Sequence, residues 1–348
     1  MAGKVTGGKF IPSSRGSAHC GERDPSIHFQ PSIFRKNLLV WYARHRRDLP
    51  WRVNRDPYRV WLSEIMLQQT RVAAVIEHYQ EFLRRFPTVQ KLAGARQSSV
   101  LAAWSGLGYY RRARMLQAAA KVVVREHGGS FPENEEALRT LPGIGRYTAS
   151  AVASIAFDQP VAVVDGNVER VLQRVSGRRL SGENLWDAAN RLLHAQKPGD
   201  FNQAMMELGA TVCTPRAPAC LTCPVVNLCA TRGELAATKK ASPQKKREIH
   251  YALDCRNNLQ ESTVFLVRRP LDAALMPGMW ELPEIVEKNH GEKPVFTLKH
   301  SITVTDYTVK IWRAAAPAVN GKMVSAHSLR SVALTGLARK ILRRAQVL

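Results

Sequence analysis

The sequence predicts a mainly α-helical domain followed by a smaller domain of mixed α and β structure, and three observations support this. From Ser32 to about Glu234, apolar residues recur at spacings of three and four, the period of an amphipathic helix. A stretch rich in Lys, Ser and Pro then interrupts the pattern, as an exposed linker would. Beyond it, apolar residues such as Val309 and Ile311 alternate as they do in strands. We therefore expect a helical domain at 32–234, a basic linker at 235–248 and an α+β domain at 249–348.

Local signals place one long helix and one break in the helical domain. Asp56 and Pro57 can cap and start a helix, which we expect to run to Thr70. Gly106 and Gly108 interrupt the next helical stretch, because glycine in a helix interior weakens the helix. These signals predict a connection just before Tyr109.

In the α+β domain, we expect strands at 249–255 and 263–268 on either side of a turn at Asn257 and Asn258. Further strand residues follow at Ile302, Val304, Val309 and Ile311. The last helix is expected to begin at Thr335 and to turn three apolar side chains inward, those of Leu337, Ile341 and Leu342.

Length and charge fit two domains that bind a polyanion. The chain has 348 residues, and 45% of them are hydrophobic, which is enough for two cores. Its 51 Lys and Arg residues against 28 Asp and Glu give a formal net charge of +23 at pH 7, which favours nucleic acid as the partner. Charge alone also fits a role in solubility or binding to an anionic membrane surface, so the motifs must decide.

The chain carries no signal of membrane insertion. No uninterrupted apolar run is long enough to cross a bilayer, and residues 1–30 lack the apolar centre of a signal peptide. We therefore expect a soluble intracellular monomer that binds no membrane, located in the cytoplasm or nucleoid if the cell is bacterial. Residues 1–31 are expected to form a disordered basic tail.

The segment 141–145, Leu-Pro-Gly-Ile-Gly, separates two helical patterns. Gly143 and Gly145 permit a hairpin whose amides point outward at the start of the next helix, a geometry that can hold a phosphate. Taken alone, the same pattern is as typical of a tight helix connection. The surrounding motifs favour nucleic acid.

Asp165 ends the apolar run 161–164 and opens a helix predicted at 168–175. Its ordinary role would be to cap that helix, since Asp is among the commonest capping residues. A catalytic role is compatible with capping. The helix N-terminus would keep the carboxylate ionised and ready to face developing positive charge.

Glu64 lies among apolar residues in the segment 61–70, and Gln68 sits one helical turn further along the same face. If that face is buried, desolvation favours the protonated carboxyl and makes Glu64 a candidate general acid. The alternative is a buried glutamate bonded to Gln68. Together with Asp165, however, Glu64 would supply the protonated and ionised carboxyl groups that cleavage of a glycosidic bond needs.

Four cysteines lie in one short segment with the spacing C-x6-C-x2-C-x5-C, namely Cys213, Cys220, Cys223 and Cys229. Four soft ligands so close together indicate a metal site rather than a disulfide framework. The ligand set suits an iron–sulfur cluster, and zinc is the generic alternative. We expect the site to be structural.

Together these motifs resemble the endonuclease III superfamily of base-excision glycosylases, which has a helix-hairpin-helix fold, and within it the adenine DNA glycosylase family. The resemblance covers residues 32–232. It is carried by six segments in the family's order, at 47–51, 61–70, 106–110, 141–149, 164–172 and 201–229.

The resemblance implies a monofunctional glycosylase with a [4Fe-4S] cluster held by the four cysteines. The superfamily's lyases carry a nucleophilic lysine where this chain has Tyr147, and Glu64 belongs to the adenine-specific signature. The implied partner is duplex DNA with adenine opposite 8-oxoguanine or guanine. Glu64 would protonate N7 of adenine and later activate water, while Asp165 would stabilise or trap the sugar cation. Tyr147 and Asn167 would position these groups.

The resemblance also implies contacts to the extruded base and to the duplex. The adenine pocket would be formed by Arg47, Leu49, Trp51 and Gln203. Plain core packing is an equally simple interpretation of Leu49 and Trp51. Residues expected to contact DNA are Gln68, Gln69, Thr70, Tyr109, Gly143 and Gly145.

The C-terminal domain resembles an abbreviated form of the Nudix-like domain that these enzymes use for damage recognition. The segment 276–283 looks like an early strand motif of that domain, and 299–303 lies where the family places its guanine-reading loop, with Ser301 and Thr303 as expected contacts. The family's Phe-Ser-His triplet is missing, and the 16 residues between Pro283 and His300 are too few for the expected helix. Nucleotide pyrophosphatase activity is not expected, because the Glu-rich catalytic pattern is absent.

Two other functions remain open from the sequence. One is a related helix-hairpin-helix glycosylase acting on thymine opposite guanine, against which the Glu64 signature argues. The other is a DNA-binding protein braced by a metal and without catalysis, against which the presence of both Glu64 and Asp165 argues.

Overall fold

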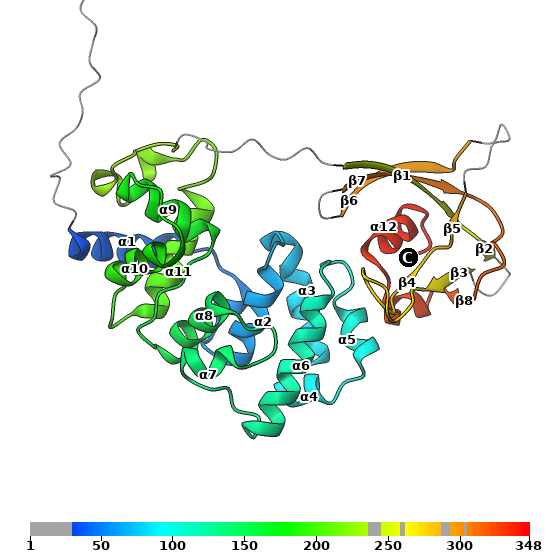
Figure 1. The fold of residues 1–348 in the computed structure, drawn as a ribbon, viewed down its shortest axis with the longest axis horizontal. Coiled ribbons are helices and arrows are strands. Elements are labelled where there is room, and N and C mark those ends of the chain that lie inside the picture. Colours follow the sequence, from blue (N-terminus) through cyan, green and yellow to red (C-terminus); the bar gives the residue numbers. More distant parts are fainter. Residues whose placement is uncertain (1–29, 236–244, 258–261, 287–292, 303–304) are drawn as a thin grey trace, which may run out of the picture.

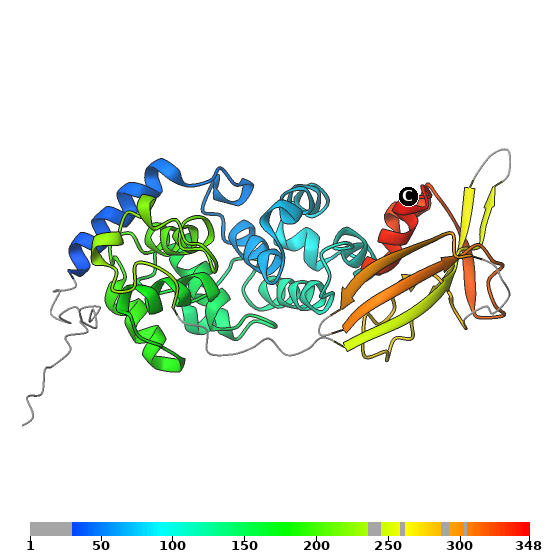
Figure 2. The ribbon, with the colours of Figure 1, turned by 90° about the horizontal axis from the view of Figure 1, so that it is seen from above.

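A computed structural model describes residues 30–235, 245–257, 262–286, 293–302 and 305–348. A helical part and a C-terminal part of strands and one helix lie side by side (Figure 1), and the view from above shows the same arrangement (Figure 2). The expected tail at 1–31 falls outside the described residues except for its last two, and Pro31 already begins a helix. In the described part, no helix is long and apolar enough to cross a membrane.

The helical part confirms the mainly α prediction. Its elements are α1 (Pro31–His45), η1 (Pro50–Arg52), α2 (Pro57–Leu67), α3 (Val72–Arg85), α4 (Val89–Ala93), α5 (Gln97–Ala103), α6 (Arg111–Glu126), α7 (Glu135–Arg139), α8 (Arg146–Phe157), α9 (Gly166–Ser176), α10 (Gly182–Leu192), α11 (Pro198–Thr211), η2 (Cys220–Thr222) and η3 (Val226–Leu228). One apolar core joins residues of α2 to α8, and a second joins α1, α9, α10 and α11. The helical part therefore has two lobes.

Helix α2 starts as expected but ends early. The Asp56 carboxylate accepts a hydrogen bond from the Arg59 amide (2.9 Å) and caps the helix. The helix ends at Leu67, so the prediction that it reaches Thr70 is wrong. Gln69 adopts a left-handed conformation with φ 55°, and the Arg112 guanidinium takes the carbonyls that a continuing helix would bond, among them that of Ile65 (2.8 Å).

The hairpin at 141–145 joins α7 to α8, as expected. Gly143 has φ +75°, and a Cβ atom there would lie 2.5 Å from Cβ of Met115 on α6. Glycine is therefore required on two grounds, backbone conformation and close packing.

The C-terminal part is α+β, as expected, and contains two sheets. Its elements are β1 (Lys245–Ala252), β2 (Cys255–Asn257), β3 (Ser262–Arg268), β4 (Trp280–Glu281), β5 (Glu284–Ile285), β6 (Phe296–Ile302), β7 (Thr305–Trp312), β8 (Gly321–Ser325), η4 (Ser328–Ser331) and α12 (Gly336–Arg344). One sheet has the order β5-β1-β7-β6, with β1 parallel to β7, and the other has the order β2-β3-β4 with β8 also paired to β3. Leu337, Ile341 and Leu342 of α12 are buried among residues of both sheets.

Two boundaries in this part need comment. Strand β1 begins at Lys245, inside the stretch expected to be linker, because residues 245–252 pair along their whole length with β7. Between Pro283 and His300, the described residues form β5 and the start of β6. The last helix begins where expected, since Thr335 is its N-cap and the Thr335 hydroxyl accepts a hydrogen bond from the Ala338 amide.

Candidate active site

A cleft of about 1040 Å³ collects most of the candidate residues. It is lined from α2, the 106–109 connection, the 141–145 hairpin, α8, the start of α9 and α11, so both lobes contribute. The sequence-predicted residues that line it are Arg47, Leu49, Trp51, Glu64, Gln68, Gln69, Thr70, Tyr109, Gly143, Tyr147, Asp165, Asn167 and Gln203. The fold thus brings together residues that are up to about 150 positions apart.

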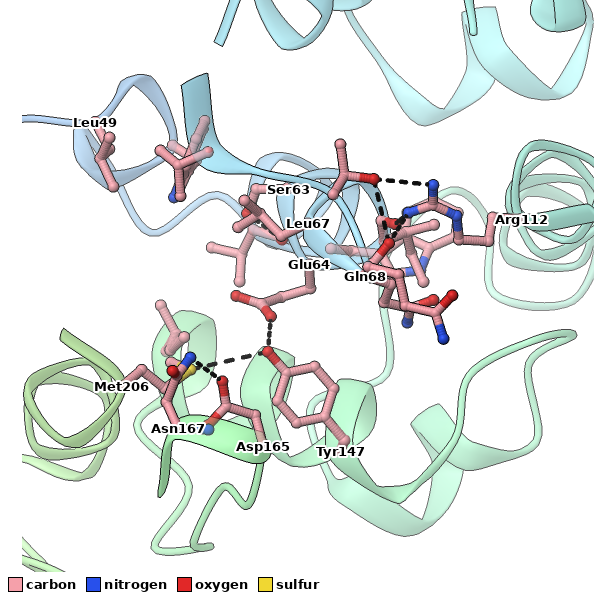
Figure 3. A pocket seen from close by; sticks show the side chains of 18 of the residues that line it. Leu49, Ser63, Glu64, Leu67, Gln68, Arg112, Tyr147, Asp165, Asn167 and Met206 are labelled. Carbon is pink, nitrogen blue, oxygen red and sulfur yellow. Dashed lines mark hydrogen bonds between the residues drawn. The ribbon is translucent and has the colours of Figure 1, made fainter. Parts of the chain in front are cut away.

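Glu64 points from α2 across the cleft to the phenol of Tyr147 on α8 (Figure 3), which donates a hydrogen bond to its Oε2 atom. Glu64 is only 6% exposed. Burial raises its pKa to about 7, and this outweighs the lowering by the Tyr147 bond. The carboxyl group can therefore hold a proton near neutral pH. The alternative of a Glu64–Gln68 pair is wrong, because the Gln68 side chain donates to the hydroxyl of Thr148 (3.3 Å).

Tyr147 is held as a proton donor. Burial raises its pKa well above the usual value, and the nearby carboxyl groups of Glu64 and Asp165 raise it further. Its hydroxyl also lies 3.8 Å from the sulfur of Met206 on α11. The phenol therefore stays protonated and fixes the orientation of Glu64.

Asp165 is the N-cap of α9. Its Oδ1 atom accepts hydrogen bonds from the amides of Asn167 (2.9 Å) and Val168 (2.7 Å), and Oδ2 accepts one from the Asn167 side chain (2.8 Å). Such donors stabilise the carboxylate anion. The capping interpretation is therefore correct, and the same residue lines the cleft.

Close packing fixes the start of α9 against α11. A Cβ atom at Gly209 would lie 2.5 Å from Cβ of Asn167, so only glycine allows this approach. Arg170 spans the same contact and donates to the carbonyl of Gly209 (2.6 Å) and to the side chain of Asn167 (2.8 Å). The Asp165 carboxylate is thus held on a rigid support.

A buried ion pair that the sequence analysis missed forms one wall of the cleft. Glu207 on α11 is 1% exposed and accepts hydrogen bonds from Arg47 Nε (2.7 Å) and Arg52 Nη2 (2.8 Å). Burial raises the pKa of Glu207, but the bonds from the two arginines outweigh it and lower the pKa to about 2. The Arg47 guanidinium is therefore held in place by the Glu207 carboxylate. A glutamate inside the apolar stretch 204–209 was the available signal.

Leu49 and Trp51 pack in the core and also lie at the cleft. They are 5% and 8% exposed and belong to the larger core, where Trp51 packs edge-on against Tyr79 with ring centroids 5.4 Å apart. Both also line the cleft. Core packing therefore holds these two side chains at the wall of the pocket.

Two strained residues stand on the rim of the cleft, on neighbouring connections. Gln69 has φ 55°, and Tyr109 has φ 45° and is 51% exposed. Arg112, also missed by the sequence analysis, ties the connections together through the carbonyl of Gln68 (2.5 Å), the hydroxyl of Thr70 (3.2 Å) and the carbonyl of Leu107 (3.1 Å). A single arginine at the start of a helix gives no sequence signal of such a role.

The four cysteines line one small pocket between α9, α11 and the loop that follows. Sulfur atoms there receive hydrogen bonds from the Arg174 guanidinium (to Cys213, 3.3 Å) and the Arg232 amide (to Cys229, 3.4 Å). Among the described residues, no group of three or more His, Cys, Asp or Glu side chains is arranged to hold a single metal ion. Neither Glu64 nor Asp165 lines this pocket.

Two predicted DNA contacts lie elsewhere, and a third residue is not described by the structure. Gly145 is the N-cap of α8 and does not line the cleft. Ser301 lies on β6, where its hydroxyl donates to the Asp306 carboxylate (2.5 Å), also away from the cleft. Thr303 falls outside the described residues.

The cleft thus presents a carboxyl group that can be protonated near pH 7 and a second one whose oxygens accept hydrogen bonds from amides at a helix N-terminus. This pairing supplies a proton to a leaving group and negative charge to a developing cation. It is suited to breaking a bond between a sugar and a basic leaving group.

The chain that forms this cleft is similar to known DNA repair proteins. Residues 62–189 match the description HhH-GPD superfamily base excision DNA repair protein. The chain is 42% identical over 321 residues to an adenine DNA glycosylase of Rattus norvegicus, covering 75% of this chain and 62% of that protein. It is 45% identical over 216 residues to an adenine DNA glycosylase of Mycobacterium tuberculosis, covering 60% of this chain and 71% of that protein.

A solved structure of similar fold is that of a thermostable thymine-DNA glycosylase, with a TM-score of 0.55 and 33% identity. The match covers 58% of this chain and 96% of that chain. This chain spans less than two thirds of the length of the rat relative.

Proposed function

The chain belongs to the adenine DNA glycosylase family, within the HhH-GPD superfamily of base excision DNA repair proteins, and from this we propose a specific activity. The protein hydrolyses the N-glycosidic bond of adenine mispaired with 8-oxoguanine or guanine in duplex DNA. The observation that carries the proposal is the buried Glu64 carboxyl, with its pKa raised to about 7, in the same cleft as the Asp165 anion.

The two carboxyl groups divide the reaction between them. Glu64 donates its proton to N7 of the extruded adenine, which makes the base a neutral leaving group when its bond to C1′ breaks. Asp165 faces the oxocarbenium ion left on the sugar and stabilises it by charge or by a transient bond. Water then adds to C1′ and gives its proton to Glu64, so adenine and an abasic site leave with the enzyme restored.

The chain acts as a hydrolase without lyase chemistry. Schiff-base formation needs a nucleophilic amine near C1′, and Tyr147 occupies the position where the lyases carry lysine. In the described part of the chain, no lysine lines the cleft. The Tyr147 phenol instead orients Glu64.

The four cysteines fit a [4Fe-4S] cluster. The four thiols line one small pocket, and a metal centre bound there would hold them as thiolates. The hydrogen bonds from Arg174 and Arg232 to sulfur are of the kind that support cluster thiolates. Cys213, Cys220, Cys223 and Cys229 would hold the cluster, which would brace the segment 213–229 beside α9, the helix that begins just after Asp165.

We further propose that the C-terminal part reads the base opposite adenine. The basic charge of the chain and the contact of the C-terminal part with the helical part, where η4 lies against α5, support a second contact with duplex DNA. Guanine and 8-oxoguanine would be compared there, while adenine is held in the cleft.

The proposal is tested by single-turnover cleavage of duplexes that carry adenine opposite 8-oxoguanine, adenine opposite guanine, thymine opposite guanine or an oxidised pyrimidine. Abasic sites are revealed by alkali, and parallel samples are treated with borohydride. Adenine release without a trapped covalent adduct is the expected result. Release of thymine instead would favour the activity named for the thymine-DNA glycosylase neighbour, and binding without release of any base would contradict catalysis altogether.

A further inference from the structure

The carbonyl oxygen of Leu334, in the C-terminal part, accepts hydrogen bonds from two buried hydroxyl groups of the helical part. Ser105 Oγ donates to it at 2.7 Å and Tyr110 OH at 2.9 Å. Leu334 is fully buried, and Ser105 and Tyr110 are each 2% exposed. A carbonyl oxygen can accept two hydrogen bonds, so both of its acceptor sites are used.

This carbonyl is fixed from its own side as well. It directly precedes Thr335, the cap of α12, whose amide donates to the Trp280 carbonyl (2.9 Å). Arg339 on α12 adds a bond from Nε to Ser105 Oγ (2.9 Å), and Met279 and Ala333 are buried in the core of the helical part. The contact is therefore a packed and fully hydrogen-bonded seam between the two parts.

The two hydroxyl donors flank the connection that carries Tyr109. Ser105 comes just before it and Tyr110 just after it. Three residues between them have positive φ, namely Gly106 (113°), Gly108 (69°) and Tyr109 (45°). A non-glycine residue in the left-handed region is held there by its surroundings rather than by preference. The seam supplies such a restraint at both stems.

The same connection is bonded to the catalytic helix through Arg112. Arg112 donates to Leu107 on one side and to the last carbonyls of α2 on the other, and its guanidinium lies 5.5 Å from the centroid of the Tyr109 ring. The start of α12 and the end of the helix that carries Glu64 are thus both hydrogen-bonded to the 105–110 segment, the first through Ser105 and Tyr110 and the second through Arg112.

We propose that Ser105 and Tyr110 are positioning residues through which the C-terminal part sets Tyr109 at the rim of the cleft for extrusion of the target base. The proposal rests on the proposed glycosylase function. It requires that loss of either hydroxyl slow the extrusion of a paired adenine and leave the bond-breaking step intact, because neither hydroxyl lines the cleft.

The test uses the full chain with Tyr110→Phe, Ser105→Ala and the double variant. Tyr58→Phe is the matched control, because the Tyr58 hydroxyl is also buried and donates to a main-chain carbonyl, that of Phe86 (2.7 Å), away from the seam. Two excision rates are measured in single turnover. One is for adenine paired with 8-oxoguanine, and the other is for adenine opposite an abasic-site analogue. The second adenine is unpaired, so its extrusion costs less free energy. Fluorescence of 2-aminopurine placed at the target position reports extrusion itself.

Each single variant is expected to slow excision of paired adenine about tenfold, because the buried Leu334 carbonyl loses one of its two donors. The fluorescence change should fall in parallel. Excision opposite the abasic analogue should stay within about twofold of wild type, and Tyr58→Phe should match wild type in all three measurements. Equal loss on both substrates, or a loss no greater than that of the control, would overturn the proposal. If the wild-type chain excises no adenine, the proposed function fails, and the fluorescence comparison alone decides the role of the seam.

Discussion

The phenol of Tyr147 donates a hydrogen bond to Oε2 of Glu64, although 83 positions separate the two residues in the sequence. The contact joins α8 to α2, two helices that pack directly against one another. It fixes the direction in which the Glu64 carboxyl faces, while burial sets its protonation. Orientation and acidity of the proposed proton donor thus come from different features of the structure.

The pH dependence of excision should follow the protonation of Glu64. Its pKa is raised to about 7, so the proton that adenine requires is present below this pH and is lost as the pH rises through it. The single-turnover rate with saturating DNA is therefore expected to decline above about pH 7, approaching about tenfold per unit of pH. A rate that stays constant from about pH 6 to 9 would show that no group of this pKa acts as the acid.

Replacement of Asp165 by Asn separates its charge from its capping role. Asn caps a helix as well as Asp does, so the melting temperature should change little. The negative charge facing the sugar is lost, and excision should fall by about a thousandfold or more while duplex binding is retained. Single-turnover excision and equilibrium binding to the same duplex measure the two effects. An active Asp165→Asn enzyme would remove Asp165 from the mechanism.

The buried pair on α11 should matter for stability as well as for the cleft. In Glu207→Gln the guanidinium groups of Arg47 and Arg52 lose their carboxylate, and we expect the free energy of unfolding to fall by about 3 kcal/mol. The control is Glu81→Gln, which breaks exposed pairs with Arg84 and Arg85 and should cost less than about 1 kcal/mol. Denaturant unfolding of the two variants gives the comparison, and equal costs would refute the structural role of Glu207.

Removal of one cysteine tests the metal site. Cys223→Ser should abolish iron and sulfide binding and destabilise the lobe that contains α9 and α11, because one of four ligands is lost. Cys255→Ser, a change in β2 of the C-terminal part, is the control and should keep the iron content of wild type. Stoichiometric zinc and no iron in the wild-type protein would contradict the assignment of an iron–sulfur cluster.

Much of the helical part could be predicted from the sequence because its signals are local. The Asp56 cap, the Leu-Pro-Gly-Ile-Gly hairpin and the helix after Asp165 each follow from a few adjacent residues. Caps and glycine turns act within one helical turn, so neighbouring residues suffice to recognise them.

The features that were missed depend on contacts between distant segments. The end of α2 is set by Arg112, which lies more than forty positions further along the chain and competes for its carbonyls. The Glu207 pair joins residues about 160 positions apart. The first four residues of β1 fall in the expected linker because Lys245, Lys246 and Arg247 are basic, although pairing with β7 makes them part of a strand. In each case the tertiary partner decides, and the local sequence does not show it.

Excision by Glu64→Gln, measured beside wild type on adenine opposite 8-oxoguanine, tests the account most directly. Glutamine keeps the size of the side chain and can still accept the hydrogen bond from Tyr147, but it has no acidic proton to give. We expect single-turnover excision to fall by about a hundredfold to ten-thousandfold with duplex binding preserved. Excision by Glu64→Gln at a rate close to that of wild type would contradict the claim that this buried carboxyl protonates the departing adenine.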